Sequence, residues 1–379
     1  MTTQGRLARG VACGAIVALG VVLRLRFVDL PLSRDEGEYA YVAQLLLHGI
    51  SPYAEAYTLR WPGIYVGYAL IEAVFGQTHT AVHLGLIVLN ALTVAAVYAL
   101  ARRLAGDVAA LSAALAYVVL SLTANFNGFA AYTEHFVVAL AVPGLVALHE
   151  ALVSRRPAWA ALGGTLLAGA MLMKQSGVVF LVFGLAWLLL ATVEERRPWL
   201  AGIGACALGA AAPLVLTAGI LVATGVFGRF WLWTMQYGTA YVSLDVPAPS
   251  SSLLWGVQAA APLYGLAGFA ALSALWDLQS RRAVAVALPL FGAAALGSAA
   301  GFYFRPQYFL LLTPPVAVLA GVGAVAVTRP LRRNTARAAV AVALVAACVA
   351  SALWLQREFF FRMDPRLLAR AAYEYNPFP

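Results

Sequence analysis

The chain has 379 residues, of which 63% are hydrophobic and only 11% are charged, and its formal net charge is +9. A soluble domain carries about 25% charged residues, so this composition excludes an ordinary soluble protein and predicts an all-α protein that crosses a membrane several times. The three cysteines, Cys13, Cys206 and Cys348, lie in separate apolar runs, which excludes a disulfide framework and a cysteine-based zinc site.

Eleven apolar runs are long enough to be considered as transmembrane helices. They cover residues 10–29, 80–101, 108–124, 134–153, 158–174, 176–193, 199–223, 252–276, 283–304, 307–328 and 338–356. No small-residue cleavage site follows the first run, and Arg24 and Arg26 interrupt its end, so we interpret it as a membrane helix and not as a signal peptide. Residues 62–76 form a shorter run, which we place with residues 35–48 as helices that lie in the outer membrane interface.

The charges predict the orientation of these helices. With the N-terminus inside, the inner segments hold 14 of the 25 basic residues and five of the 16 acidic ones, and the outer segments hold eleven of each. The whole net charge of +9 therefore falls on the cytoplasmic side, as the positive-inside rule requires. The basic excess is a topology signal, and it does not indicate nucleic-acid binding. Residues 357–379 follow the last run as an outer-face tail, which could be the start of a truncated soluble domain.

The stretch after the first apolar run carries Arg34, Asp35, Glu36 and Glu38 within five residues. Charge clustered at a membrane surface needs water or a partner. Ser33 and Glu36 also fit a capping box, with acidic residues in the first helical turn. The structural and the functional interpretation are compatible, because a helix start holds a carboxylate rigidly.

Further polar residues are sent to the same outer face by the predicted topology. In chain order they are Arg60, Tyr65, Glu134, Lys174, Gln175, Arg305 and Tyr308, joined by an aromatic segment at 227–241. Each has a structural alternative, since cations near helix ends snorkel or anchor at the interface, a glutamate at a helix start complements the dipole, and aromatic residues form an interface belt. Lys174 is the only lysine of the chain, so it asks for its own explanation.

Convergence favours the functional interpretation. Two carboxylates and three isolated cations come from four different loops on one face. Cations at a membrane surface suit a phosphate, a carboxylate beside them suits proton abstraction from a hydroxyl, and an apolar groove between helices suits a lipid chain. Together these features predict transfer of a group that is carried on a lipid phosphate.

Five short motifs carry a resemblance to a known superfamily. They are RDEGEY at 34–39, RWPGIY at 60–65, AYTEHF at 131–136, KQ at 174–175 and RPQYF at 305–309. From about residue 20 to 325 the chain resembles the GT-C superfamily of membrane glycosyltransferases, in particular the bacterial branch of the family 39 type that is similar to protein O-mannosyltransferases and aminoarabinose transferases. Where the family pattern has lysine, proline, asparagine and histidine, this chain has Arg60, Trp61, Tyr132 and Gln307. These departures concern the identity of the substrate more than the class of reaction, although Arg60 keeps the charge and not the shape of a lysine.

The resemblance implies a GT-C transmembrane catalytic domain over residues 1–356 and an inverting transfer of a sugar from a polyprenyl-phosphate donor. The acceptor, a glycan, lipid or protein, would be met on the outer face of a bacterial inner membrane. Asp35 is implied as the base, and Arg60, Lys174 and Arg305 as the cations that bind the donor phosphate. Supporting roles are implied for Arg34, Glu36, Glu134, Gln175, Tyr65 and Tyr308. Some members of the superfamily use a divalent metal and others do not; Glu36 and Glu38 are the ligands to consider.

A transporter or flippase for lipid-linked glycans is the main alternative function. A transporter predicts charges along a path through the middle of the membrane. The middle parts of the predicted spans are almost free of ionisable residues, which favours the enzyme.

Overall fold

The computed structural model describes the backbone of residues 3–194, 199–240, 242 and 250–372, and every regular element in this part of the chain is helical. The longer helices are α1 (Thr3–Leu25), α2 (Arg34–Leu47), α3 (Gly63–Phe75), α4 (His79–Ala105), α5 (Asp107–Leu120), α6 (Thr133–Ser154), α7 (Pro157–Met173), α8 (Val178–Glu194), α9 (Leu200–Ala223), α12 (Ser250–Ala259), α13 (Ala261–Ser273), α14 (Leu278–Ala299), α15 (Thr313–Val327) and α16 (Asn334–Leu355). The short elements are η1 (Ala124–Phe126), η2 (Gln175–Gly177), α10 (Phe227–Trp231), η3 (Leu232–Gln236), α11 (Tyr237–Ala240), η4 (Pro306–Leu312), η5 (Glu358–Arg362) and α17 (Pro365–Ala372).

Each of the eleven predicted spans coincides with a helix or a helix pair. Seven helical segments in the described residues are long and apolar enough to cross a membrane, and one further pair qualifies if it is counted as a single span. The three remaining segments, α5, α7 and α8, are apolar but shorter. The all-helical membrane architecture is therefore confirmed, whereas the number of eleven crossings stays a prediction.

The predicted span over residues 252–276 is not one unbroken helix. Its two helices, α12 and α13, meet at a bend of 93°. The break falls at Ala260, which has φ −132° and ψ 28°, and Pro262 follows in the first turn of α13. Proline supplies no backbone N–H donor and is compatible with the first turn of a helix, so the sequence starts a new helix here and does not continue the old one.

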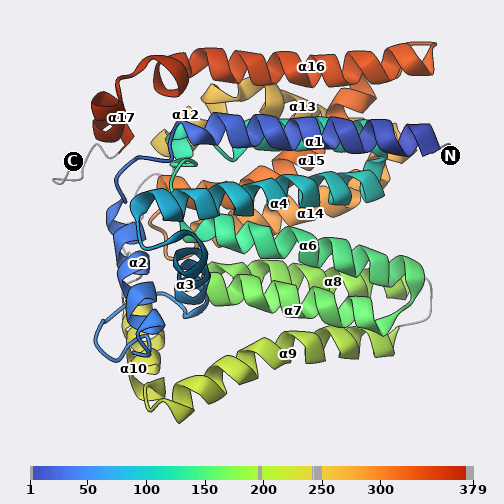
Figure 1. The fold of residues 1–379 in the computed structure, drawn as a ribbon. Helices are drawn as coiled ribbons and strands as arrows, with labels where there is room; N and C mark the ends of the chain where they lie inside the picture. The colour runs from blue at the N-terminus through green and yellow to red at the C-terminus, as the bar shows by residue number, and fades with distance from the viewer. Residues whose placement is uncertain (1–2, 195–198, 241, 243–249, 373–379) are drawn as a thin grey trace.

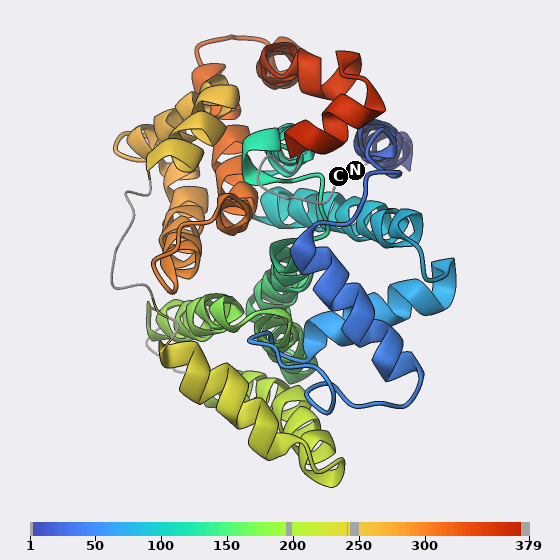
Figure 2. The same cartoon turned by 90° about the vertical axis from the view of Figure 1, so that its left-hand side faces the viewer.

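The long helices run roughly side by side, and the connections gather at two opposite ends of the bundle (Figure 1). At one end, on the left of Figure 1, lie α2, α3, α10 and α17. The view of this end shows α2 and α3 lying across the ends of the long helices (Figure 2). The helices predicted at 35–48 and 62–76 are thus present as α2 and α3, and their placement in a membrane interface stays a prediction.

The core of the bundle is centred on α15. In its span, Pro306–Val327, 89% of the most apolar window is buried, compared with 11% for α1. Small residues allow the close packing: a Cβ on Gly321 would lie 2.3 Å from the carbonyl oxygen of Ala109 in α5. The bundle therefore gives the loops at the left end of Figure 1 a rigid base, while α1 lies at its periphery.

Candidate active site

The first turn of α2 is held by the predicted capping box. The Glu36 amide donates to Ser33 Oγ at 3.3 Å, and the Ser33 amide donates to Glu36 Oε2 at 2.8 Å. This reciprocal pair fixes the direction in which α2 starts. It also separates two neighbouring carboxylates, because Glu36 turns into the protein while Asp35 stays half-buried at the surface.

Glu36 is fully buried and joins three parts of the chain. Besides Ser33, its Oε1 accepts a hydrogen bond from the Ala131 amide at 2.6 Å and lies 3.2 Å from His83 Nε2. The Nδ1 atom of the same ring lies 3.1 Å from the Val28 carbonyl oxygen, so an imidazolium at His83 satisfies both contacts. Burial alone raises the pKa of Glu36, but these donors outweigh it and lower the pKa. Both carboxylate oxygens have protein partners, which leaves Glu36 poorly suited to the metal-ligand role considered above.

Asp35 faces Arg60 across the gap between α2 and the segment before α3. The Arg60 Nη2 atom donates to Asp35 Oδ2 at 3.0 Å, and the two side chains are 22% and 14% exposed. Arg34, which is 85% exposed, lies 3.6 Å from the other carboxylate oxygen. The Arg60 guanidinium also lies over the ring of Tyr39, 5.8 Å from its centroid. A carboxylate and a guanidinium are therefore held together, accessible from one side.

Glu38 lies one turn after Asp35 and is held by two hydroxyl groups. Thr58 Oγ1 donates to Glu38 Oε1 at 2.5 Å, and the Tyr65 hydroxyl donates to the same oxygen at 3.3 Å. Thr58 Oγ1 also accepts from the Arg60 amide at 3.2 Å, so it ties Glu38 to the segment that carries Arg60. The sequence analysis missed Thr58, and the only signal for it was its place two residues before Arg60.

Glu134 and Lys174 form a buried ion pair at the starts of α6 and η2, where Lys174 Nζ donates to Glu134 Oε1. The other oxygen of Glu134 accepts from Thr133 Oγ1 at 3.1 Å. Lys174 Nζ lies 3.5 Å from the centroid of the Tyr308 ring, a cation–π contact with the η4 segment. Gln175 Nε2 donates to the Leu59 carbonyl oxygen at 2.6 Å, next to Arg60.

A close helix contact sets the position of this pair relative to the first loop. A Cβ on Gly63, at the start of α3, would lie 2.6 Å from the carbonyl oxygen of Leu172 near the end of α7. Only glycine permits this approach. It holds Arg60, three residues before Gly63, close to Lys174, two residues after Leu172.

The Gly63–Leu172 contact brings the two halves of the site together, and the surroundings of Arg60 agree with it. Burial alone lowers the pKa of Arg60, but Tyr39, Asp35, Tyr308 and Glu38 act on its charge and raise the pKa well above its usual value. Tyr308, which contacts Lys174, therefore also acts on Arg60. The predicted residues Asp35, Arg60, Glu134, Lys174 and Tyr308 thus come together in the structure.

Arg305 is the exception among the predicted cations. It is exposed, and its guanidinium lies 5.8 Å from the centroid of the Tyr303 ring. Within the described residues it pairs with none of the carboxylates of the site. Arg305 has an extended backbone at the start of η4 and precedes Tyr308 by three residues.

The aromatic segment predicted at 227–241 is helical over Phe227–Ala240 and packs on the first loop; Tyr241 lies outside the described residues. The Phe230 ring lies 5.4 Å from that of Tyr53 and 5.9 Å from that of Trp61. Arg229 donates to the Ala54 carbonyl oxygen at 2.5 Å. This segment therefore covers the loop that carries Arg60.

Arg24 is a second residue whose role the sequence did not reveal. It is buried at the end of α1 and donates to the carbonyl oxygens of Gly128 and Ser121, both at 2.8 Å. His135 Nε2 lies 3.0 Å from the same Gly128 oxygen. These contacts fix the loop that ends at Ala131, which in turn holds Glu36. Arginine at the end of an apolar run was visible in the sequence, but its partners were not.

Metal binding finds little support in the side chains present. Among the described residues, no three His, Cys, Asp or Glu are arranged to hold an ion. Glu38 accepts from two hydroxyl groups through its Oε1 atom, and both oxygens of Glu36 have hydrogen-bond partners.

Comparison with known proteins places these features in a family context. Residues 62–222 match the protein family described as dolichyl-phosphate-mannose-protein mannosyltransferase. The undecaprenyl phosphate-alpha-4-amino-4-deoxy-L-arabinose arabinosyl transferase of Pseudomonas aeruginosa strain LESB58 is 35% identical over 229 residues, which cover 55% of this chain and 41% of that protein. The chain therefore spans less than half the length of the curated relatives it matches.

Solved structures share the fold. ArnT from Cupriavidus metallidurans bound to undecaprenyl phosphate has a TM-score of 0.59 at 18% identity, covering 98% of this chain and 75% of that one. The archaeal oligosaccharyltransferase AglB from Archaeoglobus fulgidus, in complex with an inhibitory peptide and a dolichol-phosphate, has a TM-score of 0.60 at 14% identity, covering 90% and 55%. The expected resemblance is thus confirmed: residues 62–222 match the mannosyltransferase family, and the chain shares the fold of these two solved structures.

Proposed function

We propose that this protein is an inverting glycosyltransferase that moves a sugar from a polyprenyl-phosphate donor to an acceptor at the α2 and α3 end of the bundle. One observation carries the proposal. A half-buried carboxylate, Asp35, lies beside Arg60, and Arg60 in turn shares its surroundings with the Glu134–Lys174 pair. Four segments that are far apart in the sequence supply these groups.

Asp35 is the proposed base. It would take the proton from the acceptor hydroxyl as that oxygen attacks the sugar carbon, and the bond from that carbon to the donor phosphate would break on the opposite side. The configuration at the carbon is inverted by this single displacement. Before a donor binds, the partner of Asp35 is Arg60, at 3.0 Å. A donor phosphate competes for the same guanidinium and so releases the carboxylate for its task.

Arg60 and Lys174 are the proposed phosphate ligands, and Arg305 is a third cation that a bound donor would have to recruit from its exposed position. The leaving phosphate gains negative charge as the sugar departs, and preorganised cations stabilise that charge most in the transition state. Glu134 fixes the ammonium of Lys174, and Tyr308 supports it from the ring face. Tyr65, Gln175 and Arg34 are proposed to position the side chains that bind the phosphate.

Two further observations support the class of donor. The segment that matches the mannosyltransferase family contains Glu134 and Lys174 and begins two residues after Arg60. The curated relative and the solved ArnT structure both name undecaprenyl phosphate. We infer a bacterial inner-membrane location with the N-terminus in the cytoplasm and the site on the outer face, where a glycan, lipid or protein acceptor is met. The catalytic domain is proposed to cover residues 1–356, with 357–379 as an outer-face tail.

Sugar transfer in reconstituted vesicles tests this proposal. Radiolabelled polyprenyl-phosphate mannose, glucose, arabinose and galactose are offered separately with a crude envelope fraction as acceptor, to wild type and to Asp35→Asn. We expect transfer from one donor by wild type and a loss of more than about 100-fold in the variant, the range of general-base catalysis. Asp29→Asn is the matched control, since Asp29 is an exposed carboxylate in the segment before α2 and, among the described residues, accepts a hydrogen bond only from Thr80.

The possible outcomes separate the alternatives. Equal transfer by wild type and Asp35→Asn removes Asp35 from the mechanism. Movement of the labelled lipid across the bilayer without transfer from any donor overturns the enzyme and favours the transporter.

A further inference from the structure

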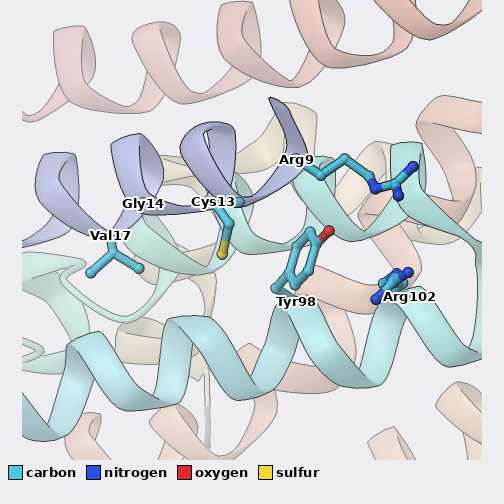
Figure 3. A pocket seen from close by; sticks show the side chains of 7 residues that line it. Arg9, Cys13, Gly14, Val17, Tyr98 and Arg102 are labelled. Carbon is cyan, nitrogen blue, oxygen red and sulfur yellow. The ribbon is translucent and has the colours of Figure 1, made fainter. Parts of the chain in front are cut away.

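A second candidate site lies at the opposite end of the bundle, in a groove between α1 and α4 (Figure 3). It is lined by Arg9, Gly10, Cys13, Gly14, Val17, Tyr98 and Arg102. The side chains of Cys13 and Val17 point from α1 toward α4, and Tyr98 points from α4 toward α1 (Figure 3). None of these residues belongs to the proposed transfer site; the lipid proposal shares with the proposed function only the cytoplasmic placement of the N-terminus.

The groove has room for a ligand. Its volume is about 630 Å³, which is within the usual range of small-molecule sites. A Cβ on Gly10 or Gly14 would meet nothing within 4 Å, so open space continues along this face of α1. Toward the middle of the bundle the lining is apolar, while the two arginines lie near the end of the groove that the N-terminus of α1 forms (Figure 3).

The polar end of the groove carries an excess of positive charge. Arg9 Nη1 pairs with Asp107 Oδ2 at 3.0 Å, and Arg102 Nε pairs with Asp107 Oδ1 at 2.8 Å. One carboxylate therefore balances two guanidinium groups, and one positive charge remains. The Nη2 atom of Arg9 is buried and has no hydrogen-bond partner among the described residues. A buried donor without a partner is costly, so this end of the groove is incomplete as an ion-pair cluster.

We propose that this groove binds one anionic phospholipid, with the head-group phosphate on Arg9 and Arg102 and an acyl chain along Gly14 and Val17. A phosphate supplies both the missing negative charge and the acceptor for Arg9 Nη2. Basic pockets between helices at the cytoplasmic surface are suited to anionic head groups. The apolar part of the groove continues along α1, which the bundle leaves mostly uncovered. An acyl chain of the same lipid can lie there.

Native mass spectrometry of the detergent-solubilised protein tests the site. Wild type is titrated with phosphatidylglycerol and with phosphatidylcholine of identical acyl chains, and the bound fractions are compared. We expect tighter binding of phosphatidylglycerol, and about fivefold weaker binding of that lipid in Arg9→Gln, since each basic residue near the surface contributes about that factor. Arg332→Gln is the matched control, an exposed arginine outside the groove.

Asp107→Asn separates lipid binding from a purely structural ion cluster. The substitution removes the competing carboxylate, so the lipid site predicts tighter phosphatidylglycerol binding, whereas a structural cluster predicts a lower melting temperature and unchanged binding. Gly14→Leu fills the apolar part of the groove without touching the arginines and should weaken both lipids. Equal binding of the two lipids by wild type, or unchanged phosphatidylglycerol binding in both Arg9→Gln and Gly14→Leu, overturns the proposal.

Discussion

The two ends of the helix bundle use the same ionic side chains in different surroundings. At the α2 and α3 end, Glu36 and Glu134 are buried and each has at least two hydrogen-bond donors. At the opposite end, Asp107 and Glu150 are about one-third exposed and pair with arginines at the surface. Asp277, the buried N-cap of α14, is the exception there.

The difference indicates what each set of charges does. Exposed pairs contribute little to stability because water and salt screen them, so the arginine pairs at the opposite end add little to the free energy of unfolding. Buried carboxylates are tolerated only with complete sets of partners. The buried carboxylates at the α2 and α3 end fix the positions of the neighbouring side chains. Among these neighbours, Asp35 and Arg60 are partly accessible.

Breaking the Glu134–Lys174 pair should have the largest effect on stability. Lys174→Met leaves a buried carboxylate without its cation, which should cost about 3–5 kcal/mol in the free energy of unfolding. Thermal melting in one detergent, monitored by intrinsic fluorescence, measures the effect as a lower melting temperature. The double variant Glu134→Gln/Lys174→Met should recover part of the loss, because no buried charge then lacks a partner. If the double variant melts lower by the full sum of the single effects, the two side chains do not act as a pair.

Glu36→Gln should have the next largest effect and lower the free energy of unfolding by about 1.5–3 kcal/mol. Hydrogen bonds to a charged carboxylate are replaced by hydrogen bonds to a neutral amide. The substitution should also change how the stability of the protein depends on pH. The pKa of Glu36 is lowered in the folded protein. Its contribution to the free energy of unfolding is therefore fully present above the pKa of the unfolded chain, near 4.5, and is lost as the pH falls through the pKa of the folded protein. Melting curves of wild type and variant, recorded from pH 6 down to pH 3, should therefore converge at the acidic end. Curves that stay parallel would exclude this role.

Gly63→Ala should cost about 1–3 kcal/mol, since the added methyl group overlaps the Leu172 carbonyl oxygen and must push α3 from α7. Sugar transfer should fall as well, because Arg60 and Lys174 move apart. Gly37→Ala is the matched control: it lies in α2, nothing would come within 4 Å of its Cβ, and alanine is the better helix former. An equal loss of melting temperature in both variants would remove the close contact as the cause.

The smallest effect is expected at the other end. The Arg103–Glu150 pair has a distance of 3.5 Å, and both side chains are about one-third exposed. Arg103→Gln should therefore change the free energy of unfolding by about 0–1 kcal/mol, and addition of salt to the wild type should have a similarly small effect. A loss as large as that of Lys174→Met would show that the contrast between the two ends does not hold.

Much of the fold followed from local patterns. Apolar run length located the long helices, and the capping box located the start of α2 within a residue. The bend between α12 and α13 was missed because apolar length alone cannot distinguish a continuous span from a broken one, although Pro262 was present in the sequence.

The candidate site was predictable only in part. Topology correctly sent Asp35, Arg60, Glu134, Lys174 and Tyr308 to one end of the bundle, where the structure brings them together. Pattern could not distinguish Asp35 from Glu36, since both are acids in the same turn. Their different fates depend on His83 and Ala131, which are 47 and 95 residues away from Glu36. Contacts over such distances depend on the packing of whole helices and leave no local signature.

The long reach of Glu36 has a consequence for biogenesis. During synthesis α2 leaves the ribosome long before Ala131, so at first only its own capping box holds it. Glu36 can be locked in place only when the loop before α6 has been made, and Lys174 and Tyr308 follow later still. The site is therefore assembled in stages and is completed only after Tyr308 has been made, when the helices from α1 to α14 have already left the ribosome.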